Sequence, residues 1–213
     1  MKLAIVEDHS MMLDFLRKIC VQVPGIQLVA EAHTGFEACD RLIHSRPDLV
    51  ILDVGLPGLD GFEVLERIRA AGVRPKVLIL SGSNDPYFVY RVERANVQAF
   101  IDKRSQTGAE LRAAIAAIDS NRSYFSESFV LERTRRRSDP LAFDKLLTEQ
   151  QLLVMCLVAD CHEDEHIGRI LGISSRTVEA HRTAIMRKLG IHTRTGLISY
   201  GQKRGFRSVS AQV

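Results

Sequence analysis

Residues 48–61 read DLVILDVGLPGLDG, and this stretch decides the fold. An apolar run over 48–52 ends at Asp53, and the loop that follows contains Pro57 and Gly58. The run is rich in Val, Ile and Leu and barely alternates with polar residues, which is typical of a parallel strand covered on both faces. Four similar runs lie on either side of it, at 2–6, 27–31, 76–80 and 97–101.

Amphipathic segments separate these runs and predict helices. In the first segment Met12, Phe15, Leu16 and Ile19 recur at helical spacing. The predicted helices cover about 10–22, 35–46, 61–71, 86–95 and 108–120. Five strand–helix units in order predict an α/β domain over residues 1–121, a doubly wound, five-stranded parallel sheet of the flavodoxin-like kind.

The composition is that of a soluble globular protein. The 213 residues are 46% hydrophobic and 26% charged, and two domains of about 100 residues fit this length. No apolar run is long enough to span a membrane, and the N-terminal MKLAIVEDHS does not have the pattern of a secretory signal. The cysteines at 20, 39, 156 and 161 form no CxxC pair, so we expect a cytoplasmic protein without a disulfide framework or a zinc ribbon.

Residues 122–143 have no sustained period and are predicted to form a linker with one short helix around 126–133. Arg135, Arg136 and Arg137 within it are either a solvated tether or an auxiliary contact with a phosphate backbone. The net charge is −2 over residues 1–121, +2 over 122–140 and +3 over 141–213. This asymmetry permits a nucleic-acid contact near the C-terminus but does not demonstrate one.

From residue 144 onward the pattern is helical and predicts an all-α domain over 144–213. Thr148 is placed to cap a helix of about 12 residues. Three further helices are predicted over 163–171, 175–188 and 195–203, and Gly172 and Ser174 fit the tight turn of a helix-turn-helix. Ile167, Ile170 and Leu171 are predicted to face the core.

Acidic residues follow the predicted strands at the edge where ligands bind in such sheets. Glu7 and Asp8 follow the first strand, Asp53 ends the third, and Lys103 follows the fifth. Three carboxylates in one crevice favour a hard divalent cation, and Mg²⁺ that also coordinates a phosphate fits better than Ca²⁺. An aspartate beside Mg²⁺ and a lysine is a candidate phosphoryl acceptor, and Ser81 offers a hydroxyl to a phosphoryl oxygen.

The set Glu7-Asp8, Asp53–Gly61, Ser81-Gly82 and Phe100–Lys103 resembles the receiver domains of response regulators. The resemblance implies that Asp53 is the phosphoacceptor and that Ser81 and Lys103 contact the phosphoryl group. It implies that Asp8, Asp53 and the backbone carbonyl of Gly55 bind Mg²⁺, with Glu7 acting through water. Phe100 matches the aromatic residue that swings inward on activation, although Ala99 and Arg104 depart from the usual pattern.

The segment from Leu147 to about 206, with Thr177-Val-Glu-Ala-His181 and Ile185–Gly190, resembles LuxR-type DNA-binding domains. Together with a receiver it resembles a NarL/FixJ-type regulator, which implies that helix 175–188 docks in the major groove. Its periodicity places Val178, Ile185 and Leu189 toward the core. The implied base-edge contacts are Glu179, Ala180, Arg182 and Thr183, and the implied phosphate contacts are Arg176, Thr177 and Lys188.

Two features depart from the LuxR-type pattern. Gln151 stands where a glutamate is usual, and the acidic stretch 163–165 replaces a stretch that usually contains a lysine. Acids at this place are expected to repel phosphate and weaken DNA binding, or to shift the docking. The last helix, with Leu197, Ile198 and Tyr200, resembles the helix through which such domains dimerise.

The sequence thus predicts a phosphorylation-controlled, DNA-binding response regulator that is not an enzyme. A sensor histidine kinase transfers a phosphoryl group to Asp53, and the activated protein binds double-stranded DNA as a homodimer, without a membrane partner. One alternative is a regulator that binds DNA regardless of phosphorylation and uses its receiver for dimerisation. Another is a phosphorylation-controlled protein-interaction module whose helix-turn-helix no longer binds DNA, and a distant third is a metal-dependent phosphohydrolase that acts on small molecules.

Overall fold

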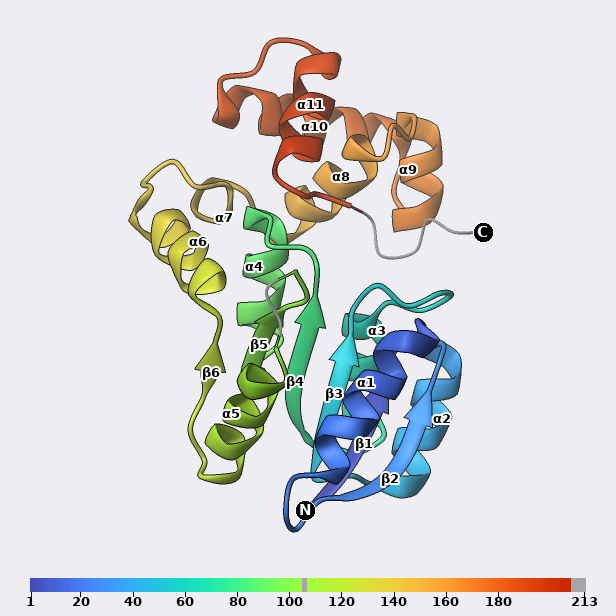
Figure 1. Ribbon diagram of the computed structural model, residues 1–213. Helices are drawn as coiled ribbons and strands as arrows, with labels where there is room; N and C mark the ends of the chain where they lie inside the picture. The colour runs from blue at the N-terminus through green and yellow to red at the C-terminus, as the bar shows by residue number, and fades with distance from the viewer. Residues whose placement is uncertain (105–106, 208–213) are drawn as a thin grey trace. The chain divides into compact units, whose positions relative to one another are not determined.

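The N-terminal part forms a parallel sheet in the computed structural model, which describes residues 1–104 and 107–207 (Figure 1). The strand order is β2-β1-β3-β4-β5-β6, and every neighbouring pair is parallel. The strands are β1 (Lys2–Val6), β2 (Gln27–Ala32), β3 (Leu49–Asp53), β4 (Lys76–Ser81), β5 (Ala99–Asp102) and β6 (Tyr124–Phe125). The prediction of an α/β domain is confirmed, but the sheet has six strands instead of the predicted five. The predicted DNA-binding domain extends to 213, and its residues 208–213 lie outside the described residues.

Helices between the strands cover both faces of the sheet. Figure 1 shows α1 and α5 on one face and α2 and α3 on the other. The core under α1 and α5 contains Leu16, Ile5, Ile51 and Ile115, all at most 1% exposed. The helices of this part are α1 (Ser10–Val21), α2 (Gly35–Ser45), α3 (Gly61–Ala70), α4 (Pro86–Arg94) and α5 (Gly108–Asp119). The near-continuous apolar strands are therefore buried from both sides, as their composition predicts.

The segment predicted as a linker contributes to the sheet. The amide of Tyr124 donates to the carbonyl of Gln98 and the amide of Ser126 donates to the carbonyl of Phe100, so β6 pairs with β5. Helix α6 (Glu127–Ser138) follows and is longer than the short helix predicted over 126–133. Within the arginine triplet, Arg136 is 6% exposed and forms an ion pair with Asp144, whereas the Arg135 side chain is 85% exposed. The arginine triplet is therefore not a fully solvated tether, because Arg136 is buried.

Five helices follow α6 along the described chain. They are α7 (Phe143–Leu146), α8 (Glu149–Ala159), α9 (Asp164–Leu171), α10 (Ser175–Leu189) and α11 (Arg194–Lys203). Thr148 caps α8 together with Gln151 in a reciprocal capping box, so the glutamine serves here as glutamate does in such boxes. The four helices predicted after residue 144 are confirmed, and α7 is an addition.

Helices α9 and α10 form the helix-turn-helix. Gly172 ends α9 with a φ of +65°, and the Ser174 side chain accepts a hydrogen bond from the Thr177 amide at the start of α10. Ile167, Val178 and Ile185 are fully buried, as predicted. Ile170 was predicted to face the core, but it is 48% exposed because the amphipathic stripe of this short helix is narrower than its apolar sequence suggests.

Residue contacts divide the described chain into two compact units. The first comprises residues 1–84 and 92–130, and the second comprises 85–91 and the described residues from 131 onward. All four cysteines are free thiols, and Cys161 alone among them is exposed. Within the described residues, no helix has both the length and the apolar character needed to cross a membrane.

Gly35 is packed so closely that a side chain does not fit. A Cβ atom added at this position would lie 2.1 Å from the backbone oxygen of Leu59, in the loop before α3. We expect Gly35→Ala to lower the free energy of unfolding by about 1–3 kcal/mol, because the loop backbone must move. Urea unfolding measures this change. Gly82→Ala is the matched control, since no atom lies within 4 Å of its added Cβ, and equal losses in the two variants would contradict the packing argument.

Candidate functional site

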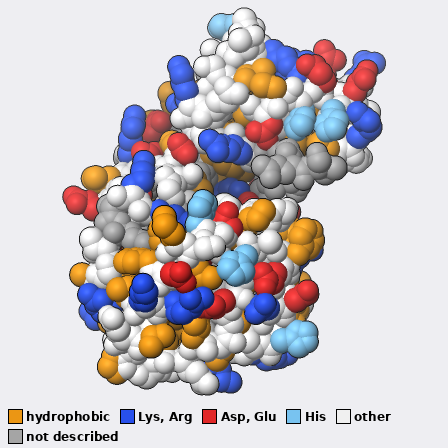
Figure 2. Space-filling view, turned by 45° about the vertical axis from the view of Figure 1, so that its right-hand side comes forward, with side chains coloured by type: hydrophobic (Ala, Val, Ile, Leu, Met, Phe, Trp, Pro, Cys, Tyr) orange, Lys and Arg blue, Asp and Glu red, His pale blue; other side chains and the backbone are white. Residues whose placement is uncertain are grey.

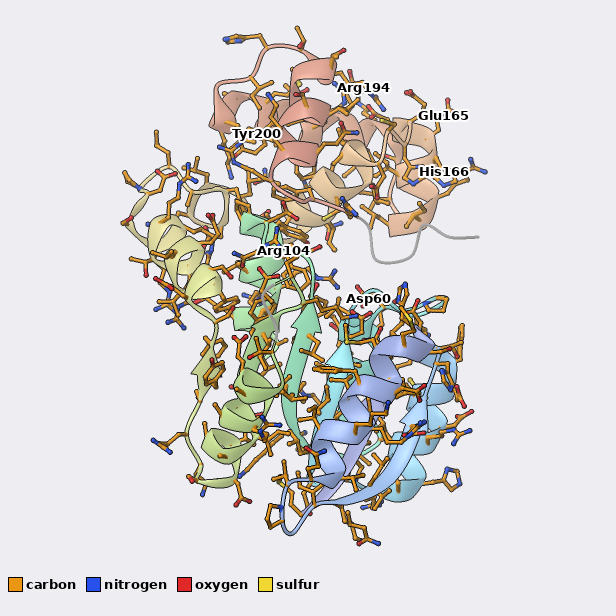
Figure 3. The ribbon with its side chains drawn as sticks, in the orientation of Figure 1. Asp60, Arg104, Glu165, His166, Arg194 and Tyr200 are labelled. Atoms are coloured by element: carbon orange, nitrogen blue, oxygen red, sulfur yellow. The ribbon has the colours of Figure 1, made fainter. Side chains whose placement is uncertain are left out.

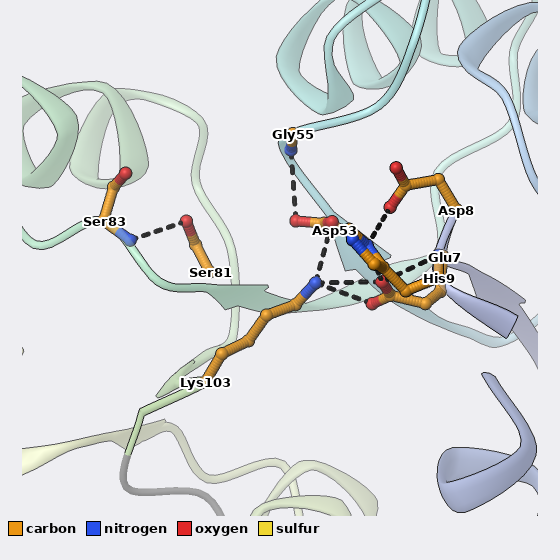
Figure 4. Close-up of polar contacts among 8 residues, drawn as sticks. All are labelled: Glu7, Asp8, His9, Asp53, Gly55, Ser81, Ser83 and Lys103. Carbon is orange, nitrogen blue, oxygen red and sulfur yellow. Dashed lines mark hydrogen bonds and ion pairs between the residues drawn. The ribbon is translucent and has the colours of Figure 1, made fainter. Parts of the chain in front are cut away.

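Carboxylates and a lysine converge at the carboxyl edge of the sheet (Figure 4). Glu7 directly follows β1, Asp53 is the last residue of β3, and Lys103 directly follows β5. The Lys103 Nζ donates to Asp53 Oδ2 at 2.8 Å and to Glu7 Oε1 at 3.0 Å. The residues that the sequence placed at successive strand ends are therefore in direct contact, although 50 and 96 positions separate Lys103 from its two partners.

Two carboxylates of this cluster are buried, and burial makes their charged forms less favourable. Glu7 is fully buried and Asp53 is 6% exposed. Burial raises the pKa of Glu7 above its ordinary value, and the charge of Asp53 raises it further, while the hydrogen bond from Lys103 opposes both effects. Burial by itself would lower the pKa of Lys103, but its hydrogen bonds to Asp53 and Glu7 raise that pKa overall. One ammonium group thus balances two buried carboxylates.

Asp8 lies at the open side of the cluster, with its side chain 26% exposed. His9 Nδ1 lies 2.8 Å from Asp8 Oδ1, and the ring is 76% exposed. The ligand atoms of Glu7, Asp8 and His9 all lie within 4.8 Å of one another. Carboxylate oxygens at this spacing fit a hard divalent cation. Sequence reasoning missed His9, although its position directly after the acidic pair could have indicated it.

Ser81 and Gly55 complete the surroundings of Asp53. Ser81 ends β4 and its backbone carbonyl accepts from the Lys103 amide at 3.0 Å, which places the two residues on adjacent strand ends. The Ser81 hydroxyl accepts from the Ser83 amide at 3.1 Å. The Gly55 amide donates to Asp53 Oδ1 at 3.1 Å and so fixes one carboxylate oxygen. Figure 4 shows the Lys103 amine reaching Asp53 and Glu7 from the β5 side.

Phe100 lies on β5, three residues before Lys103, and is fully buried. Its ring centroid is 4.9 Å from that of Phe129 on α6, which in turn lies 5.0 Å from Phe125 of β6. Sequence reasoning missed Phe129, because the aromatic spacing 124, 125 and 129 stood in a segment read as a linker. The predicted switch residue is therefore in direct contact with the helix that follows the sheet.

An exposed stripe on α10 forms the second candidate site. Ala180 and Thr183 are exposed on this helix, together with the charged side chains on either side of them. The stripe borders a groove lined by Arg176, Glu179, Ala180, Thr183, Ala184 and Arg187. Six of the seven residues implied in DNA contact are exposed on α10, namely Arg176, Thr177, Glu179, Ala180, Thr183 and Lys188. Arg187, which is also exposed, was absent from the implied contacts.

Two of the implied DNA contacts, Arg182 and Lys188, form hydrogen bonds to other helices of the helical unit. The Arg182 guanidinium donates to both carboxylate oxygens of Asp164 on α9, at 2.9–3.2 Å. The Lys188 amine donates to the carbonyl of Leu146 and to Gln151 Oε1, each at 2.8 Å. Sequence reasoning could not find these partners, since they come from other helices.

Acidic and basic side chains are interspersed around α9 (Figure 2). Glu165 and His166 project outward from α9, while Arg194 stands at the beginning of α11 (Figure 3). The Arg194 guanidinium donates to Asp164 Oδ1 at 3.1 Å and to the carbonyl of His162 at 2.6 Å. In α11, Leu197 is fully buried in the core of the unit, so it is not available to a dimer interface formed by that helix.

Comparison with known proteins identifies both parts of the chain. Residues 3–116 match the family model of the response regulator receiver domain, and residues 145–200 match that of the LuxR family of bacterial regulatory proteins. The transcriptional regulatory protein LiaR of Bacillus subtilis is 28% identical over 205 residues, covering 95% of this chain and 97% of LiaR. The DNA-binding transcriptional activator EvgA of Escherichia coli is 28% identical over 203 residues, covering 95% and 98%.

Solved structures agree on the fold. RcsB from Salmonella enterica serovar Typhimurium, bound to promoter P1flhDC in the presence of the phosphomimetic BeF3⁻, matches with a TM-score of 0.67 at 22% identity. This match covers 94% of this chain and 97% of RcsB. The family consists of transcriptional regulators and not of enzymes. The chain therefore belongs to the response regulators, as a DNA-binding member of the NarL/FixJ type that joins a receiver domain to a LuxR-type helix-turn-helix.

Proposed function

We propose that phosphorylation of Asp53 by a sensor histidine kinase controls DNA binding by the helix-turn-helix. The observation that carries this proposal is the contact of the Lys103 ammonium with Asp53 at 2.8 Å, beside the acidic pair Glu7 and Asp8. A carboxylate so placed is a nucleophile next to groups that stabilise charge on the transferring oxygens. The carboxylate oxygen forms a bond to phosphorus, while the bond from phosphorus to the donor breaks and the donor keeps the electron pair.

The residues present fit a bound Mg²⁺. Asp8, Asp53 and the Gly55 carbonyl would hold it, with Glu7 acting through water, and the ion would supply positive charge to the phosphoryl oxygens. Lys103 holds the phosphoryl group from the β5 side. The Ser81 hydroxyl, which accepts from the Ser83 amide at 3.1 Å, is placed to turn toward the same oxygens.

Phe100 is the residue whose packing changes when Asp53 is phosphorylated. A shift of Ser81 toward a phosphoryl group frees space near β5, which favours a different packing of the Phe100 ring. Because this ring contacts Phe129 at 4.9 Å between centroids, its movement changes the surface on which α6 packs. The shift in population between the two packings then favours a homodimer that binds two half-sites.

The exposed stripe of α10 is proposed to enter the major groove of double-stranded DNA. Glu179, Ala180 and Thr183 are placed for base edges, and Arg176, Thr177 and Arg187 for phosphates. The test measures DNA affinity of the full-length protein with and without a small phosphodonor and Mg²⁺. A rise in affinity on phosphorylation supports the proposal. Equal affinity in both states favours the regulator that binds DNA regardless of phosphorylation, and no binding in either favours the interaction module.

Phe129 offers a test of the coupling step. We expect Phe129→Leu to keep phosphorylation of Asp53 at the wild-type rate, because the residue lies outside the carboxylate cluster. The variant removes the ring that Phe100 contacts, so the gain in DNA affinity on phosphorylation falls severalfold. Fluorescence anisotropy with labelled duplex measures this gain. Phe36→Leu is the control, since Phe36 is 57% exposed on α2, and an unchanged gain in Phe129→Leu would remove α6 from the switch.

A further inference from the structure

Asp164 holds two arginines at the base of the helix-turn-helix. Its carboxylate accepts three hydrogen bonds from Arg182 on α10, at 2.9–3.2 Å, and one from Arg194 on α11 at 3.1 Å. The side chains of Asp164 and Arg182 are 17% and 18% exposed. Charge-assisted hydrogen bonds from two nitrogens of one guanidinium to one carboxylate are directional, so they fix where the guanidinium lies.

The ion pair withholds a cation from the surface that faces DNA. Arg182 is one residue from Thr183 and three from Glu179, both of which are exposed on the stripe of α10. The Arg182 guanidinium can move to a phosphate only by giving up its three hydrogen bonds to Asp164, which would leave that largely buried carboxylate with Arg194 alone of the two arginines. Arg194 keeps two other partners, the carbonyl of His162 and Glu163 Oε2 at 3.2 Å, and is held independently of Asp164.

We propose that Asp164 is a positioning residue that lowers the sequence-independent part of DNA affinity by keeping Arg182 away from phosphate. This inference rests on the proposed DNA binding, and it names Asp164 as the residue that limits the affinity. The acidic stretch 163–165, expected from the sequence to act by repelling phosphate, acts here through a specific partner. Base-edge contacts through Glu179, Ala180 and Thr183 then account for a larger share of the binding free energy, which favours discrimination among sequences.

The salt dependence of DNA affinity reports the number of phosphate contacts, because each contact releases counterions from the DNA. Each phosphate contact adds about −0.9 to the slope of log affinity against log salt concentration. Asp164→Asn keeps the size of the side chain and an oxygen acceptor, but it removes the charge that holds Arg182. We expect its slope on a random-sequence duplex to steepen by about 0.9 per bound protomer. The loss of affinity between 50 and 200 mM KCl would then be about 3.5-fold larger for each bound protomer than for the wild type.

Three further variants separate release of Arg182 from simple loss of an acid. Glu165→Gln removes the same charge from the same turn of α9, where Glu165 is exposed, and is expected to change the slope by much less. The double variant Asp164→Asn with Arg182→Gln is expected to return to the wild-type slope. Arg182→Gln alone is expected to leave the slope unchanged, because the arginine makes no phosphate contact in the wild type.

Several outcomes would overturn the inference. A slope for Asp164→Asn equal to that of the wild type, or one that stays steep in the double variant, rules out a role for released Arg182. A slope about 0.9 shallower in Arg182→Gln alone shows that Arg182 already contacts phosphate, and this result stands even if Asp164→Asn folds poorly. Failure of the wild type to bind any duplex at 50 mM KCl overturns the proposed DNA binding instead, so the two failures are distinguishable.

Discussion

Asp53→Asn is expected to take up no phosphoryl group from a small phosphodonor and Mg²⁺, whereas the wild type gains one. The amide lacks the nucleophilic carboxylate oxygen that lies 2.8 Å from Lys103 in the wild type. The fold is expected to persist, because the change is nearly isosteric and relieves repulsion between Asp53 and buried Glu7. Intact-mass spectrometry measures the uptake, and the same sample is used to measure the change in DNA affinity, which should disappear with it.

Asp102→Asn is the matched control for this loss. Asp102 also ends a strand of the sheet and is 3% exposed, but its carboxylate accepts hydrogen bonds from Arg104 and Ser128. Its variant is expected to take up one phosphoryl group as the wild type does. Phosphorylation that persists in Asp53→Asn would assign the acceptor to another carboxylate and contradict the proposed site.

Lys103→Met should have the largest effect on stability in the receiver. Its side chain is 17% exposed and its amine is the shared partner of Asp53 and fully buried Glu7. Removing one member of a buried ion pair leaves an unpaired charge, so we expect the free energy of unfolding to fall by about 3 kcal/mol without Mg²⁺. Millimolar Mg²⁺ should restore more stability to this variant than it adds to the wild type, since the cation replaces the lost positive charge.

Urea unfolding with and without Mg²⁺ tests this expectation. Lys76→Met provides the control, because the Lys76 amine donates to the Ile118 carbonyl and to the Asn121 side chain and leaves no carboxylate unpaired. The free energy of unfolding of Lys76→Met is expected to fall by no more than about 1 kcal/mol. Equal stability of Lys103→Met and the wild type in the absence of Mg²⁺ would show that the cluster does not depend on the lysine for charge balance.

The carboxylate cluster could be predicted from sequence because parallel topology determines it. Once five apolar runs are ordered into strands, Glu7, Asp53 and Lys103 must meet at one edge of the sheet. The direct contacts of the Lys103 amine with both acids follow from that topology and not from local propensity. His9 escaped notice because its contact with Asp8 depends on a side-chain orientation that periodicity does not describe.

The predictions failed or fell short where partners come from distant elements. Strand β6 is only two residues long and shows no alternation, so no period marks it; its pairing with β5 decides its conformation. Arg182 lies next to the exposed stripe by helical geometry, yet Asp164 of α9 determines where its guanidinium lies. The acidic stretch 163–165 was interpreted from its net charge alone, whereas Asp164 within it accepts hydrogen bonds from Arg182.

The pairing of β6 with β5 determines where the receiver can be cut for study. A fragment that stops at residue 121 exposes the backbone groups of Gln98 and Phe100 that accept from β6, and it uncovers the Phe100 ring that Phe129 now shields. Such a fragment presents an unprotected edge strand, which is a template for self-association. A fragment that extends to Val130 retains both the strand and the first turn of α6, so it is the better choice for work on the isolated receiver.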